Sequence, residues 1–440
     1  MQKKIFIKTF GCQMNEYDSE RILETLKKIN YTKTINPIEA DCYILNTCHI
    51  REKATDKVYH DIGRIKKLFK DKRKPIMVVA GCVAQAEGEI LMKREKYIDC
   101  VIGPQSYHYL NNILLQLERK NEKINFTEFE AEGKFDNLEY IENSKEKVSS
   151  YLTIQEGCDK FCKFCVVPYT RGPEFSRKFE QIISEAKQLI SNGSKEIILL
   201  GQNVNAYNNS NKRLSDLILE LENINGLERL RFTTSHPKDM SEDLIKLFSV
   251  SKKLMPHLHL PVQSGSNKIL KNMNRKHTVE DYQKIIFKLR EINPKIEFTS
   301  DFIIAYPGET EKDFRYSLKL LKEVKFINTY SYIFSPRYGT PAAKLNLIEK
   351  QTAKNRLIEF QNISENIKKE YKKKLLNKTL KVLFENKIND NQFFGRDEHQ
   401  NSVVVNCKEN IIGKKICVRI KDFNLNTMTG DLLYNKNLAA

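Results

Sequence analysis

The strongest constraint on the fold is a regular alternation of short apolar segments and helical patterns in the middle of the chain. Six segments with strand-like composition are separated by stretches whose apolar residues recur every three or four positions. Strands are predicted at residues 151–155, 196–200, 230–234, 258–262, 296–305 and 329–334, and helices at 179–189, 214–221, 242–248, 279–292 and 311–323. Alternating strands and helices form parallel sheets. Six such units predict a barrel or an incomplete barrel with its site at the carboxyl ends of the strands.

The regions on either side of this predicted barrel have different patterns. Before it, strand-like runs at residues 4–10, 41–46, 75–80 and 100–102 alternate with helical patterns, which predicts an open parallel α/β domain over residues 3–119. Residues 121–147 hold eight acidic and four basic side chains without apolar periodicity, so we expect residues 120–147 to be a connector. The barrel domain then spans residues 148–374 and ends in a long basic helix.

The C-terminal region is predicted to be a small all-β barrel over residues 377–440. Short β-rich runs at 380–384, 402–406 and 416–421 are separated by Asn, Gly and Asp turn residues. The fold class is therefore α/β with three parts: an open parallel sheet, a partial barrel and a terminal β-barrel.

Charge favours a polyanionic partner. The chain has 74 Lys and Arg against 56 Asp and Glu, a net charge of +18, and residues 64–74 hold seven basic side chains and one acid. Clustered cations neutralise phosphates, although they also suit the solvated end of a helix. No apolar run approaches the ~18–20 residues of a membrane span, and the apolar run 5–7 is too short for a signal peptide. We expect a cytoplasmic protein with no membrane contact.

Three of the ten cysteines lie in one loop after the first predicted barrel strand. Cys158, Cys162 and Cys165 have the spacing C-x3-C-x2-C, so three thiolates converge from a single tight turn. Three such ligands can hold three irons of a [4Fe–4S] cluster and leave the fourth iron open for chemistry. A zinc knuckle completed by a distant ligand is the alternative, because zinc is usually held by four protein ligands or by three and a water.

Three further cysteines each follow a predicted strand of the first domain. Cys12, Cys48 and Cys82 directly follow strand-like runs that end in Phe-Gly, Asn-Thr and Ala-Gly, respectively. Carboxyl ends of neighbouring parallel strands open into one crevice, so these thiols are expected to form a second metal site. Buried core cysteines are the alternative. The remaining four, Cys42, Cys100, Cys407 and Cys417, are assigned structural roles.

The cysteine loop resembles the cluster-binding loop of the radical S-adenosylmethionine (SAM) enzymes, whose core is a six-unit partial barrel. The resemblance implies that SAM chelates the open iron and is cleaved to a 5′-deoxyadenosyl radical. It places Phe164 near the adenine of SAM, Gly201 and Gln202 near its methionyl end, and Gly308 near its nucleoside. Glycine permits close approach of the backbone to a ligand, although each glycine also fits an ordinary turn. Ala305 stands where this family commonly has glycine.

Along nearly its whole length the chain resembles the radical SAM methylthiotransferases, which combine a three-cysteine domain, a radical SAM barrel and an RNA-binding TRAM barrel. The motifs that carry this resemblance are residues 9–20, 157–172, 200–205, 259–265, 273–275 and 334–341. The amino-acid sequences of these motifs are similar to those of the branch that modifies N6-isopentenyladenosine beside the tRNA anticodon. The ribosomal-protein branch usually has Pro-Lys-Asn after the first cysteine and the threonylcarbamoyladenosine branch tends toward Lys-Val-Asn. This chain has Gln13-Met14-Asn15.

The resemblance implies a complete reaction. The radical would take the hydrogen from adenine C2, a bond that side-chain acids and bases cannot break. A second [4Fe–4S] cluster on Cys12, Cys48 and Cys82 would hold the sulfur, so SAM would serve as both methyl donor and radical source. The implied partners are tRNA carrying isopentenyladenosine and an electron donor such as flavodoxin or ferredoxin. Tyr169, Arg171 and Arg337 are predicted substrate contacts because they lie in the motifs.

Three alternatives remain open from the sequence. Two are methylthiotransferases that act on threonylcarbamoyladenosine in tRNA or on a ribosomal-protein side chain. The third is not an enzyme but a zinc-stabilised RNA-binding protein that uses the same six cysteines. Metal content separates the last from the others, because two [4Fe–4S] clusters bring about eight irons per chain.

Overall fold

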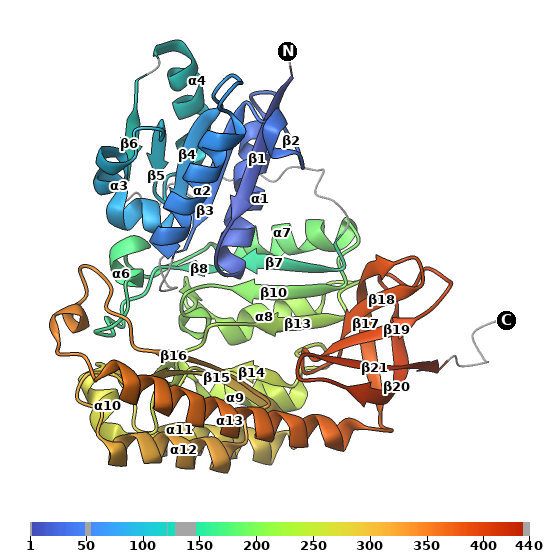
Figure 1. Ribbon diagram of the computed structural model, residues 1–440. Helices are drawn as coiled ribbons and strands as arrows, with labels where there is room; N and C mark the ends of the chain where they lie inside the picture. Colours follow the sequence, from blue (N-terminus) through green and yellow to red (C-terminus); the bar gives the residue numbers. More distant parts are fainter. Residues whose placement is uncertain (1, 49–53, 121, 128–146, 434–440) are drawn as a thin grey trace. The chain divides into compact units, whose positions relative to one another are not determined.

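The computed structural model describes residues 2–48, 54–120, 122–127 and 147–433, which form two compact units (Figure 1). The first unit contains the described parts of residues 1–143 together with the segments 155–177 and 335–343. The second contains the described parts of 144–154 and of 344–440, with residues 178–334 between them. Within the described ranges no helix is long and apolar enough to cross a membrane.

The first unit is built on a six-stranded parallel sheet with the order β2-β1-β3-β4-β5-β6. Its strands are β1 (Lys3–Thr9), β2 (Tyr31–Lys33), β3 (Cys42–Thr47), β4 (Ile76–Gly81), β5 (Cys100–Ile102) and β6 (Ile124–Phe126), and its helices are α1 (Gln13–Lys27), α2 (Ala54–Leu68), α3 (Cys82–Arg94) and α4 (Leu110–Lys120). Alternate strand residues pack in two cores: Ile44 and Val78 with α1 and α4, Leu45 and Val79 with α2 and α3. The predicted open α/β sheet is confirmed.

Two edge strands were not expected from the sequence. The strands β2 and β6 have three residues each, and only Tyr31 of the six is buried, so neither forms the apolar run that predicted β5 at the same length. Strand β6 pairs with β5 and lies inside the predicted connector 120–147, so the start of that segment belongs to the sheet. Residues 128–146 of the predicted connector lie outside the described residues. The segment 155–177 adds the short elements β8 (Gln155–Glu156), α6 (Val167–Thr170) and β9 (Phe175–Ser176).

The second unit contains the predicted partial barrel. Six parallel strands form two sheets, β13-β10-β7 and β14-β15-β16, and the bridge between Leu230 and Leu254 joins β13 to the start of the second sheet. The strands are β7 (Ser149–Thr153), β10 (Glu196–Leu200), β13 (Arg229–Phe232), β14 (His257–His259), β15 (Glu297–Ile304) and β16 (Asn328–Ile333). The helices are α7 (Phe179–Ser191), α8 (Leu214–Glu222), α9 (Glu242–Val250), α10 (Asn267–Asn272), α11 (Val279–Ile292) and α12 (Glu311–Val324), and a small hairpin joins β11 (Asn208–Asn209) to β12 (Lys212–Arg213).

A long helix, α13 (Lys350–Leu375), leads to a closed five-stranded barrel. The strands are β17 (Thr379–Asn389), β18 (Gln392–Arg396), β19 (Ser402–Asn406), β20 (Lys415–Phe423) and β21 (Thr427–Leu433), in the order β17-β18-β19-β21-β20. Buried arginines of β13 hold it: Arg229 donates to the carbonyl oxygens of Arg396 and Lys381 at 2.7 and 2.8 Å, and Arg231 to that of Glu398 at 2.7 Å. The predicted terminal β-barrel is confirmed, and within the second unit it is anchored on strand β13.

Candidate functional site

The carboxyl edge of the first sheet brings Cys12, Cys48 and Cys82 to three neighbouring strands. Cys12 caps the start of α1, Cys48 follows β3 directly, and Cys82 is the first residue of α3. The strand order reverses between β1 and β3, and ligands bind at such a reversal in open α/β sheets. The predicted placement of the three cysteines at strand ends is therefore confirmed, at the position where this fold forms sites.

Two glycines let the loops close tightly around Cys48. Gly11 has φ +126°, and a Cβ built on it would lie 2.3 Å from Cβ of Cys48. Gly81 has φ +94°, and its Cβ would lie 2.3 Å from the carbonyl oxygen of Thr47. Any other residue would be strained and would push the loop away. The glycines that precede Cys12 and Cys82 thus let the loops at these strand ends lie close to the loop of Cys48.

The surroundings of the thiols favour the thiolate form at one of them. A hydrogen bond with Cys48 lowers the pKa of Cys12 to about 6, against the effect of burial and with help from the positive charge of Arg171. Burial opposes the charge of Arg171 itself, but Asp18 and Cys82 hold its pKa well above the usual range. Because metals bind the thiolate, this electropositive position suits a soft metal centre.

Arg171 is the centre of a buried polar network. Its guanidinium is 2% exposed and lies 2.7 Å from the Asp18 carboxylate and 3.5 Å from that of Glu156. Gln105 donates to the Glu156 carboxylate at 3.0 Å and to the backbone oxygen of Arg171 at 2.7 Å. The geometry gives no support to the predicted substrate contact by Arg171, because the side chain is enclosed by carboxylates. It links α1 to the cysteine loop instead.

The C-x3-C-x2-C loop connects β8 to α6 within the same unit. The turn is closed by hydrogen bonds from Cys165 N to Cys162 O at 2.9 Å and from Cys158 N to Gly172 O at 3.3 Å. Burial, with a further effect of Cys162, raises the pKa of Cys158 to about 11. A Cβ on Gly157 (φ +73°) would lie 1.8 Å from the carbonyl oxygen of Pro173, so only glycine fits there.

Both cysteine triplets belong to the first unit and approach each other through its elements. Helix α6, which follows the loop, packs against α3, which begins at Cys82. Thiols of this kind suit iron–sulfur clusters chemically. Among the described residues, however, no three His, Cys, Asp or Glu side chains lie at the spacing of a metal site, so both ligand sets stay predictions.

Other predicted site residues surround the loop. Phe164 is half-buried within it, and Tyr169 is 45% exposed with its ring edge-on to Phe161 at 6.4 Å. Arg337 donates to Ser335 at 2.9 Å in the segment 335–343, and that segment reaches the loop through Ala342 N, which donates to Lys163 O at 2.9 Å. The structure thus brings these residues beside the cysteines, and their roles stay predictions.

The remaining predicted SAM contacts lie in the second unit. Gly201 and Gln202 follow β10 directly, at the carboxyl end of a barrel strand, as predicted. Gly308 has φ +84°, and a Cβ on it would meet only Asn272, at 3.9 Å, so space is open there. Ala305 also has positive φ, +57°, the conformation in which glycine is preferred.

The sequence reasoning missed a buried pair that holds this turn. Glu309 accepts hydrogen bonds from Ala305 N at 3.1 Å and from Arg356 at 3.0 Å, and Lys268 donates to Gly308 O at 3.0 Å. Burial raises the pKa of Glu309 to about 7, although Arg356 opposes this shift. An acid directly after a Pro-Gly turn was the available signal, but its partner on α13 is distant in sequence.

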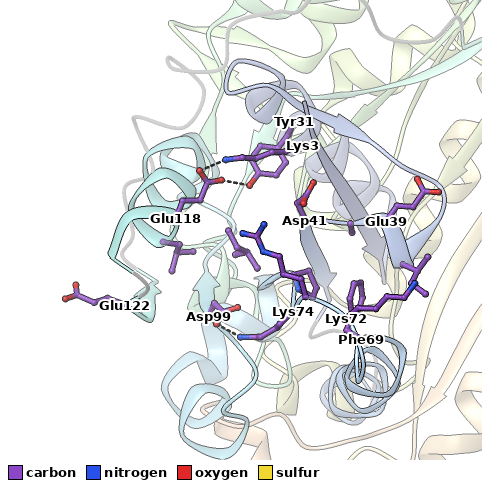
Figure 2. A pocket seen from close by; sticks show the side chains of 16 residues that line it. Lys3, Tyr31, Glu39, Asp41, Phe69, Lys72, Lys74, Asp99, Glu118 and Glu122 are labelled. Atoms are coloured by element: carbon purple, nitrogen blue, oxygen red, sulfur yellow. Dashed lines mark hydrogen bonds and ion pairs between the residues drawn. The ribbon is translucent and has the colours of Figure 1, made fainter. Parts of the chain in front are cut away.

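A cavity of about 790 Å³ occupies the opposite, amino edge of the first sheet (Figure 2). Glu118 there accepts hydrogen bonds from Lys3 at 2.5 Å and from the Tyr31 hydroxyl at 2.7 Å, and Lys74 pairs with Asp99 at 2.5 Å. The amino ends of strands are not where open α/β sheets bind ligands. The cavity is therefore separate from the cysteine site.

Family models match three parts of the chain. Residues 4–103 match a family described as "Uncharacterized protein family UPF0004", residues 152–321 match the radical SAM superfamily and residues 373–433 match the TRAM domain. The solved structure of a radical S-adenosylmethionine methyltransferase, TsrM, from Kitasatospora setae has a TM-score of 0.58 and 12% identity, with 78% of this chain and 77% of that chain covered. At this identity the likeness concerns the fold.

Curated relatives match nearly end to end. A protein of Pelagibacter ubique is 58% identical over 439 residues, with 98% of each chain covered, and one of Ruegeria sp. is 47% identical, with 98% of this chain and 99% of the relative covered. A relative from Rickettsia rickettsii is 48% identical, with 98% and 100% covered. All three are named tRNA-2-methylthio-N(6)-dimethylallyladenosine synthase.

Proposed function

The chain belongs to the tRNA-2-methylthio-N(6)-dimethylallyladenosine synthase family of radical SAM enzymes, and on that premise we propose that it adds a methylthio group to adenine C2 of N6-isopentenyladenosine beside the tRNA anticodon. The observation that carries this proposal is 58% identity over 98% of both chains. The relatives' name agrees with this substrate and not with threonylcarbamoyladenosine or a ribosomal protein.

The superfamily match supports SAM and one cluster, whereas the second cluster is an addition made by this proposal. Membership of the radical SAM superfamily implies SAM and one [4Fe–4S] cluster. The proposal assigns that cluster to Cys158, Cys162 and Cys165, and a second one to Cys12, Cys48 and Cys82. When bound, these groups supply the hydrogen-abstracting radical, the methyl group and the sulfur.

We propose residues of this chain that hold the two clusters, SAM and the substrate. Gly11 and Gly81 let three strand-end loops converge, and Arg171 supplies a buried positive charge next to thiols that bind metal as anions. The turn 305–308, fixed by Glu309 and Arg356, leaves open space at Gly308 for a nucleoside. Phe164, Gly201 and Gln202 are the other proposed SAM contacts, and Tyr169 and Arg337 the proposed substrate contacts.

The proposed RNA partner agrees with the basic charge of the chain. The TRAM barrel matches a family model, and basic residues 64–74 surround the end of α2. Lys66 and Lys74 of this segment pair with Glu95 and Asp99 at 2.7 and 2.5 Å, which leaves Lys67, Lys70, Lys72 and Arg73 exposed for phosphates. An electron donor such as flavodoxin or ferredoxin is a further proposed partner.

The test uses purified, iron-loaded protein under anaerobic conditions, with SAM, a chemical reductant and tRNA that carries isopentenyladenosine. We expect about eight irons per chain and the 2-methylthio nucleoside by mass spectrometry. Cys158→Ala should lose both SAM cleavage and product, whereas Cys12→Ala should still cleave SAM but make no product. Cys417→Ala, a cysteine away from strand ends, is the matched control and should behave as wild type. Zinc in place of iron, with no SAM cleavage, would contradict the proposal.

A further inference from the structure

The sheet β14-β15-β16 has one covered face and one face that carries exposed tyrosines. Helix α13 covers the first face (Figure 1). There, Thr329 is hydrogen-bonded to Ser364 at 2.5 Å and the ring of Phe302 lies 4.7 Å from that of Phe360. Successive side chains of a strand point to opposite faces. Tyr330 and Tyr332 of β16 therefore lie on the other face, where they are 48% and 57% exposed.

Neighbouring side chains hold one of these rings in position. The ring of His259 on β14 lies edge-on to that of Tyr330, with 6.0 Å between centroids. His259 is itself held by a hydrogen bond between its Nδ1 and Thr299 at 2.9 Å, and its Nε2 lies 3.6 Å from the Asp301 carboxylate. An aromatic side chain held in this way loses little conformational entropy when a ligand contacts it.

The spacing of the two tyrosines along the strand is about twice the stacking distance of bases. Residues i and i+2 of a strand lie about 6.7 Å apart along its axis, since each residue adds about 3.3–3.4 Å. Bases stack at about 3.4 Å, so one base between two rings needs about twice that distance. We propose that Tyr330 and Tyr332 form a stacking platform for an unpaired base of the substrate RNA; this proposal rests on the proposed function.

The chemistry beside Tyr330 favours a nucleobase over an apolar protein segment. The ring of His259 contacts that of Tyr330, and His259 in turn contacts Thr299 and Asp301, so polar groups lie next to this tyrosine. Such a site suits a ligand that has flat faces and hydrogen-bonding edges. RNA-binding proteins recognise splayed, unpaired bases by stacking them on aromatic side chains. The net charge of +18 attracts the RNA backbone, whereas the platform would act on the base itself.

The experiment measures binding of a synthetic anticodon stem–loop that carries isopentenyladenosine, by fluorescence anisotropy at several salt concentrations. Tyr330→Ala and Tyr332→Ala should each weaken binding by between about fivefold and about 100-fold at every salt concentration. The slope of affinity against salt should stay unchanged, because no phosphate contact is lost. Tyr330→Phe and Tyr332→Phe should restore binding, since they keep the ring.

Tyr316→Ala is the matched control, because Tyr316 is a similarly exposed tyrosine, 43%, on the outer helix α12. Iron content and melting temperature check that each variant is folded. If both alanine variants bind the stem–loop as tightly as wild type, the platform is wrong and the proposed function stands. If wild-type protein neither binds nor modifies the RNA, the proposed function fails and the platform fails with it.

Discussion

The buried charge network around Arg171 gives the sharpest test of how the first unit is held together. Arg171→Met would leave the carboxylates of Asp18 and Glu156, each 1% exposed, without their cation. Removal of one partner from a buried ion pair costs about 3–5 kcal/mol, because the remaining charge stays desolvated. We therefore expect a loss of about 3–5 kcal/mol in the free energy of unfolding of this unit. The cysteine loop should lose its attachment to α1 at the same time.

The matched control is Arg315→Met on α12. Arg315 also contacts two carboxylates, those of Glu311 and Glu359 at 2.7 and 2.5 Å, but its side chain is 57% exposed. Solvent screens exposed ion pairs of this kind, so this variant should change the free energy of unfolding far less than Arg171→Met does.

Hydrogen exchange of β1, β3 and α6 at increasing urea concentrations measures the free energy of unfolding of the first unit. Equal losses for the two variants would refute the argument from burial. The triple variant Arg171→Met, Asp18→Asn, Glu156→Gln should recover most of the loss, because no charge then stays buried alone.

Two further predictions concern the turn that precedes α12. Ala305→Gly should stabilise the barrel by about 0.5–1 kcal/mol, because the left-handed conformation costs alanine about 1–2 kcal/mol and glycine adds about 0.4–1 kcal/mol of unfolded-chain entropy. Ala186→Gly inside α7 should instead destabilise it by about 2 kcal/mol, because it lowers helix propensity and also removes a buried methyl group. Thermal melting compares the two variants. Burial raises the pKa of Glu309 from 4.5 to about 7, so its contribution to stability is present below about pH 4.5 and is lost as the pH rises through about 7. Melting temperatures from pH 4 to 8 should show this loss in wild type and not in Glu309→Gln; an identical pH dependence in both would contradict the assignment.

The periodic parts of the fold could be predicted from the sequence because their signals are local. Strands β3, β4 and β5 are runs of buried, mostly apolar residues, and β1 carries three apolar residues around the buried Ile5. The cysteines that follow β1, β3 and β4 were predicted from the ends of these runs. Strands β18 and β21 were missed because Gly395 and Gly430 interrupt their patterns, and these glycines are required where the barrel strands approach closely.

The parts that escaped prediction depend on contacts between distant residues. Arg171 lies in a recognisable motif, yet its partners Asp18 and Glu156 come from α1 and β8, and no local pattern indicates that an arginine is buried. The same holds for Arg229 and Arg231, whose alternation within β13 gives no sign of the backbone carbonyls that they bind. These contacts can be predicted only once the fold is known, because they join residues that are distant in the sequence.

The central claim is that this chain methylthiolates isopentenyladenosine in tRNA. The most direct measurement is mass spectrometry of tRNA nucleosides from a bacterial strain that lacks its own enzyme of this family, with and without this protein. We predict that isopentenyladenosine accumulates in the deletion strain and that this chain, but not its Cys158→Ala variant, converts it to the 2-methylthio form. Full expression of the iron-loaded protein with no 2-methylthio nucleoside would contradict the account.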